Sequence, residues 1–232
     1  MPHYRSALIS PFPIAAEVAA RVSTIAAITA VRNGHGLVTL RLELVDGKAV
    51  GATIVLVDPG PLGPRLGRAV RFDLTGPTIA ERRAAWTRLS AALGGRTLAG
   101  WAAATYLAPR LADELAALDR RAAPERRATP RPGSDRRTAG VDPLRRAIER
   151  RAVLDLHLLT RDIADAFPSA PFGRVVGSLA ISPGGLTFER LWLSLRRAGL
   201  VADSPTDARD AALLAALLPA LARFTVAPQP TP

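Results

Sequence analysis

Two kinds of side chain in this sequence have the chemistry to act on a ligand: the acids with three histidines, and the many arginines. No cysteine is present, which excludes disulfides, thiolate zinc sites and cysteine nucleophiles. His35 falls on a glycine-rich turn and His157 on an apolar stretch, and neither has a second metal ligand at the usual spacing. His3 lies near the start of the chain. These residue types therefore predict no metal centre.

Arginines are concentrated in one part of the chain. The net charge is +11, and residues 120–151 contribute +7 of it, with eleven arginines against four acids. Lys48 is the single lysine. Most arginines of this segment come in adjacent pairs: Arg120-Arg121, Arg126-Arg127, Arg136-Arg137, Arg145-Arg146 and Arg150-Arg151.

Two interpretations of this arginine segment remain open. Arginines beside a nucleic-acid-binding fold would neutralise phosphates without reading the base sequence. Alternatively, the segment is a solvated linker in a chain that uses arginine in place of lysine throughout. No aromatic residue is interleaved with the arginines, which argues against a single-strand binder that stacks bases there.

The elements that must position these residues begin with strands. The β-branched stretch Ser23–Val31 predicts a buried strand, and Leu37–Val45 alternates apolar and polar residues. Asp46-Gly47 is a hairpin signal, after which Ala49–Val57 returns as a third strand. The opening of the chain therefore predicts a three-stranded antiparallel meander.

Helical patterns follow. Thr78 and Glu81 form a capping box before a helix over 82–93, which Gly94-Gly95 ends. The later predicted elements are a strand over 96–100, a helix over 102–118, a strand over 151–160, a loop after it, and helices over 186–198 and 206–224. This order predicts an α/β fold with a mixed sheet flanked by helices.

The composition also predicts how the chain is divided. We expect an N-terminal extension over 1–22, the two parts of one domain over 23–121 and 144–224, and a disordered tail over 225–232. Alanine, proline and arginine dominate 122–143, which predicts a linker or insertion between the two parts. The apolar stretch Pro13–Val31 contains Glu17 and Arg21, so we expect no membrane span, no secretory signal and a cytoplasmic location.

Several strings in this order resemble the DEDDh 3′–5′ exonucleases, the family of the proofreading epsilon subunit of bacterial DNA polymerase III. The ordered set covers roughly residues 24–222, and it implies a ribonuclease H-like fold of the exonuclease type. The strings are Ala49–Pro61, Val70–Ile79, Leu98–Leu107, Val153–Leu156, Leu186–Leu191 with Ala198–Leu200, and Asp207–Ala211.

The resemblance extends to the scaffold and not to the chemistry. In this family four acids hold two divalent metals, and a histidine acts as general base. The first two acids fall on Thr29 and Val31, or in the alternative register on Val31 and Asn33; the third falls on Tyr106 and the histidine on Pro205. Only the fourth acid, Asp210, is present. The resemblance therefore implies a pseudoenzyme without a cofactor, in which Mg²⁺ or Mn²⁺ would matter only if activity remained.

Asp210 and Trp101 each have a second interpretation. Asp210 is either a remaining metal ligand or an acid that favours the start of a helix. Trp101 stands where the family has a histidine, and it is either a platform for a nucleotide base or a core residue at a strand–helix junction. We expect Trp86 and Trp192 to be core residues.

The sequence thus leads to three functional hypotheses. The first is an inactive exonuclease-like protein that binds the backbone of single-stranded DNA or RNA through Trp101 and the arginine segment. The second is a structural or regulatory partner in a replication or repair assembly. The third is an active metal-dependent 3′–5′ exonuclease. Fold alone decides between none of them.

Overall fold

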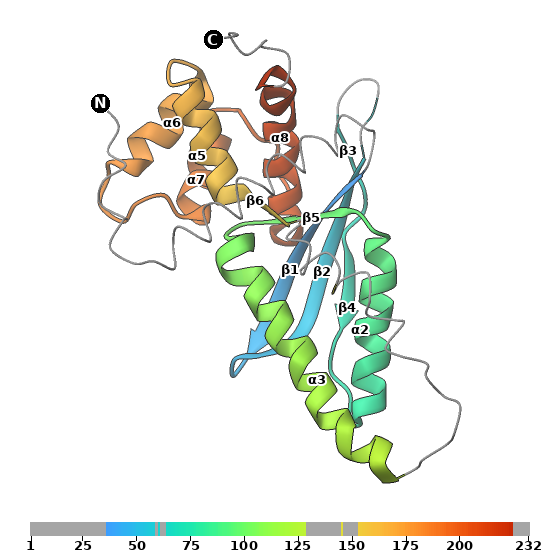
Figure 1. Cartoon of the computed structure of the whole chain (residues 1–232). Coiled ribbons are helices and arrows are strands. Elements are labelled where there is room, and N and C mark those ends of the chain that lie inside the picture. The colour runs from blue at the N-terminus through green and yellow to red at the C-terminus, as the bar shows by residue number, and fades with distance from the viewer. Residues whose placement is uncertain (1–35, 59, 61–63, 129–144, 146–152, 225–232) are drawn as a thin grey trace, which may run out of the picture.

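The computed structural model describes residues 36–58, 60, 64–128, 145 and 153–224 (Figure 1), with the backbone alone for 121–128 and 219–224. The expected strand over Ser23–Val31 lies outside these residues. The same is true of Thr29, Val31 and Asn33, where the resemblance placed the first two acids.

A mixed sheet forms the centre of the fold. Its strands are β1 (Leu37–Val45), β2 (Lys48–Asp58), β3 (Arg65–Leu66), β4 (Val70–Asp73), β5 (Thr97–Gly100) and β6 (Val153–Asp155). The order across the sheet is β3-β2-β1-β5-β6, with β4 also paired to β2. Strands β1 to β4 pair antiparallel, whereas β5 is parallel to both β1 and β6. This is the predicted α/β architecture, a mixed sheet flanked by helices, and it is consistent with a ribonuclease H-like sheet.

The β1–β2 hairpin forms where the sequence predicts it. Asp46 and Gly47 both have positive φ, 49° and 68°, which is the backbone conformation of the two-residue turn that matches strand twist. Beyond β2 the sheet has two further antiparallel strands, where the sequence predicted none. They are β3 and β4, and β4 occupies residues that the sequence comparison had assigned to a turn. A strand this short is stabilised by its pairing with β2, which the local sequence does not reveal.

Two helices cover one face of the sheet. Helix α2 (Ile79–Leu93) begins with the predicted capping box, in which the Thr78 hydroxyl and the Glu81 carboxylate each accept from the other's backbone N–H. A π-helical turn, η1 (Ala103–Leu107), leads into α3 (Ala108–Ala128). Helix α3 continues to Ala128, so the first residues of the expected linker are helical. The core on this face includes Val38, Leu40 and Trp86.

The remaining helices cover part of the opposite face (Figure 1): α5 (Leu156–Ala166), α6 (Pro171–Ala180), α7 (Phe188–Arg197), the 3-10 turn η2 (Thr206–Ala208) and α8 (Arg209–Phe224). Their core includes Leu37, Val55 and Trp192. Leu37 and Val38 enter opposite cores because successive residues of a strand point to opposite faces. Both Trp86 and Trp192 are core residues, as predicted, with 0% and 2% exposure.

Two predicted boundaries on this side are wrong. The strand expected over 151–160 ends at Asp155, because the Asp155 side chain accepts hydrogen bonds from the backbone N–H groups of His157 and Leu158 and caps α5. The loop expected after it contains α6, which begins with Pro171 in its first turn, a position that proline tolerates. In the part of the chain that is described, no helix combines the length and apolar character needed to cross a membrane.

Candidate functional site

Asp210, the one acid that matches the exonuclease pattern, lies in the first turn of α8 against the sheet. Its side chain is half-buried, and burial raises the pKa of Asp210 to about 6. The nearby Arg41 guanidinium works against this shift, whereas the charge of Glu189 on α7 adds to it. Asp210 is therefore a carboxylate in an unfavourable setting, offset in part by one arginine.

Arg41 reaches this site from the middle of the sheet. It is exposed, its position on β1 puts it on the same face as Leu37, and its Nη1 donates to the carbonyl oxygen of Thr206 at 3.1 Å. Glu43, two residues further along β1, is already paired with Arg71 of β4 at 2.5 Å. The resemblance placed the first two acids near the end of the strand expected over 23–31 and made 37–45 the second strand, so it gave no role to Arg41.

Asp210 with Arg41 beside it does not fit a site for two divalent metals. Magnesium needs several oxygen ligands, and an arginine guanidinium stays protonated and repels a cation. Among the residues described, no three His, Asp or Glu side chains gather as metal ligands. Tyr106, at the expected third-acid position, is 57% exposed on η1, and Pro205 precedes η2.

Trp101 directly follows β5 and belongs to an aromatic cluster. Its ring meets His157 edge-on at 5.0 Å and Phe188 edge-on at 5.4 Å, and Phe188 stacks on Trp192 at 6.2 Å. Trp101 is half-buried against the core, and desolvation lowers the pKa of His157, although Asp155 opposes that shift. These contacts favour packing as the main role of the Trp101 ring.

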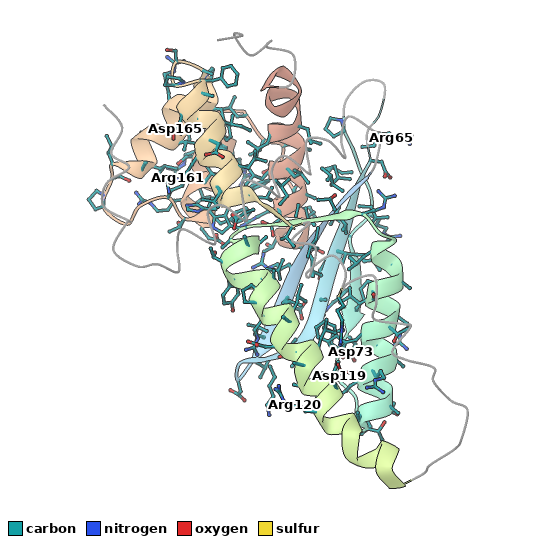
Figure 2. The ribbon with its side chains drawn as sticks, viewed as in Figure 1. Arg65, Asp73, Asp119, Arg120, Arg161 and Asp165 are labelled. Carbon is teal, nitrogen blue, oxygen red and sulfur yellow. The ribbon has the colours of Figure 1, made fainter. Side chains whose placement is uncertain are left out.

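The arginine segment is only partly described. Arg120 is exposed on α3, next to Asp119 (Figure 2), and Arg121, Arg126 and Arg127 belong to the same helix. Arg145 donates to Asp119 at 2.7 Å. Arg136, Arg137 and Arg146 lie outside the described residues.

The structure does not bring Asp210 and the arginines of α3 together. Helix α3 packs on the sheet face opposite to α8, and its arginine-bearing end extends beyond the sheet (Figure 1). On this face, Arg83 of α2 also approaches Asp119, at 3.5 Å. A groove of about 550 Å³ runs beside it along α2, and its described lining is Ile79, Ala80, Arg83, Ala84, Thr87 and Arg88. The molecule therefore has two separate candidate regions.

Comparisons of the chain with protein-family models, with curated proteins and with solved structures gave no match.

Proposed function

We propose that this protein binds the backbone of single-stranded DNA or RNA without cleaving it. The observation that carries the proposal is the placement of the described start of the arginine segment. Its first four arginines, Arg120, Arg121, Arg126 and Arg127, belong to one helix, and that end of α3 extends beyond the sheet. A projecting helix with this charge suits contact with phosphates, which attract arginine regardless of base sequence.

Arg41 supports the part of the proposal that concerns cleavage, namely that the protein does not cleave the strand. In the exonucleases that the sequence resembles, four acids hold two divalent metals that activate water and stabilise the leaving oxygen. Here a guanidinium from β1 lies beside Asp210 and hydrogen-bonds the turn before α8. The positive charge offsets the acid, so this pairing disfavours a cation site.

A salt titration tests the binding. We expect fluorescence anisotropy to show binding of a labelled single-stranded oligonucleotide that weakens steeply with salt, because each phosphate contact contributes about 0.7 to the log–log slope for single strands. Replacing Arg120, Arg121, Arg126 and Arg127 by glutamine should lower the slope by up to about 2.8, which is four contacts at about 0.7 each. Glutamine is a good helix former, so α3 should persist.

The matched control removes the same charge elsewhere. Arg65, Arg68, Arg174 and Arg197 are all exposed on other parts of the chain (Figure 2 labels Arg65, which lies far from Arg120). Replacing these four by glutamine should leave most of the slope intact. Equal losses in the two variants would show that net charge alone attracts the strand, and would contradict a binding helix.

Product size on a gel tests the absence of cleavage. The oligonucleotide should stay intact in Mg²⁺ and in Mn²⁺. Shortened products that disappear in chelator and in Asp210→Ala would overturn the inactive assignment in favour of an exonuclease. An intact oligonucleotide that never binds would instead favour a protein partner, such as a component of a replication or repair assembly.

A further inference from the structure

One carboxylate on α3 holds two arginines that reach it from different parts of the chain. Arg145 Nη2 donates to Asp119 Oδ2 at 2.7 Å, and Arg83 Nη2 of α2 lies 3.5 Å from Asp119 Oδ1. The exposed fractions of the Arg83, Arg145 and Asp119 side chains are 30%, 32% and 37%. Each carboxylate oxygen thus faces a different guanidinium, and two oxygens of one phosphate group could be held in the same way.

More cationic and polar groups border this cluster. Arg120, the next residue on α3, is exposed, and Arg83 also lines the groove along α2 together with Arg88 and Thr87. The rest of the described lining is small or apolar, so the arginines and the threonine hydroxyl provide its polar groups. A chain of phosphates and sugars matches this combination of charge, hydroxyl and open space.

The cluster can exchange its anion. Ion pairs at this exposure contribute little to stability, because water and salt screen them. An arginine–phosphate contact is charge-assisted and frequently bidentate, and a polyanion brings several such contacts at once. A bound strand can therefore displace the Asp119 carboxylate without disturbing the core.

Building on the proposed function, we propose that Arg83 and Arg145 form a phosphate seat beside the α2 groove and that Asp119 occupies this seat in the free protein. The backbone of the strand binds by displacing Asp119. Both guanidiniums then face phosphate oxygens, next to the arginines at the end of α3. Asp119 acts as an internal competitor that sets the affinity of this surface.

Asp119→Asn tests the seat because asparagine keeps the size of the side chain and loses the competing charge. We expect the affinity for a labelled single-stranded oligonucleotide at about 100 mM salt to rise roughly three- to tenfold, the range set by releasing two exposed ion pairs. Adding Arg83→Gln and Arg145→Gln to this variant should remove the gain.

Asp113→Asn is the matched control, since Asp113 is an exposed aspartate on the same helix. It makes the same change in net charge and should raise the affinity less than twofold. Should Asp119→Asn fail to fold by circular dichroism, Asp119→Ala and Asp113→Ala repeat the comparison with the best helix former.

The outcomes separate the two proposals. Equal gains from the Asp119 and Asp113 variants, in a protein whose binding depends on the arginines of α3, would overturn the seat and leave the proposed function standing. A gain that survives removal of Arg83 and Arg145 would also overturn the seat. A wild-type protein that binds no oligonucleotide would overturn both.

Discussion

Asp210 and Asp119 both lie beside arginines, and they lie on opposite sides of the sheet. Asp210 is half-buried at the start of α8, where burial raises its pKa to about 6 despite Arg41. Asp119 is about a third exposed on α3 and is shared by Arg83 and Arg145. The same two residue types therefore serve different purposes: the first pair offsets the cost of burial, whereas the second is open to solvent and exchangeable.

This difference shows that residue types in the sequence do not by themselves locate the candidate binding surface. The sequence pattern points to Asp210, since it alone matches a catalytic position. The Asp119 ion pairs, the groove along α2 and the arginine-bearing end of α3 belong to the other side of the molecule. The best binding candidate is therefore separate from the position that resembles a catalytic acid of the exonucleases.

The largest change in stability is expected at a third aspartate, Asp155, whose role is entirely structural. Asp155 is 1% exposed and accepts from the backbone N–H groups of Ala104, His157 and Leu158. Asp155→Ala leaves these donors without their acceptor and should lower the free energy of unfolding by about 2–4 kcal/mol in urea denaturation. Asp165→Ala, at an exposed site on α5 (Figure 2), should change it by less than about 0.5 kcal/mol.

Asp210 should lower stability at neutral pH. Its pKa of about 6 in the folded chain exceeds the unfolded value of about 3.9, so the folded state binds the proton more tightly. Stability is therefore lost as the pH rises from about 4 to 6, and Asp210→Asn should recover about 1–2 kcal/mol at pH 7 and remove this dependence. Urea denaturation at pH 5 and pH 7.5 measures both effects.

Asp207 supplies the control for this pH dependence. It is an exposed aspartate in η2, three residues before Asp210. Asp207→Asn should leave the pH profile of stability unchanged. A wild-type protein that is no more stable at pH 5 than at pH 7.5, with the profile of Asp210→Asn equal to its own, would show that burial of this carboxylate has no energetic consequence.

Arg41→Gln should separate the two regions further. Removing this cation eliminates the interaction that lowers the pKa of Asp210, so the pKa should rise above its value in the wild-type chain. Carboxyl-carbon NMR across a pH titration measures the change. Oligonucleotide affinity should fall less than twofold, since Arg41 lies on the other face; a loss as large as that of the α3 variant would place the strand over Asp210 instead.

The smallest effect is the stability change of Asp119→Asn. Exposed ion pairs contribute about 0–1 kcal/mol, so thermal unfolding should shift by only a few degrees. A larger loss of stability would show that Asp119 is a structural tie between α2 and α3, and would argue against an exchangeable anion.

Local signals in the sequence predicted several elements correctly. The Thr78–Glu81 capping box, the Asp46-Gly47 turn and the glycines after α2 each depend on interactions within a few residues, so the local pattern is sufficient. The short strands were predicted less evenly. The four-residue β5 was predicted correctly, whereas β6 was predicted too long and β4 was assigned to a turn. A strand of three or four residues carries too short a pattern to show where it ends or whether it pairs.

The residues of the candidate sites also fall into those that the sequence singled out and those that it did not. Asp210 and the arginine pairs were visible as residue types, and Asp210 was found through the resemblance to the exonuclease pattern. Arg41, Arg83 and Asp119 were missed, although an Arg-x-Glu spacing on β1 was present in the sequence. Their roles depend on partners between 26 and 165 residues away, such as Asp119 for Arg145 and Thr206 for Arg41.

By itself the sequence determined the α/β class, the caps of α2, the burial of Trp86 and Trp192 and the concentration of arginine after residue 120. Each of these follows from composition or from contacts between near neighbours. Only the tertiary structure decided that α3 carries those arginines on the face opposite Asp210 and that a guanidinium lies beside that acid. The physical reason is that strand order and pairing assign side chains to one face of the sheet or the other, and no local pattern contains that information.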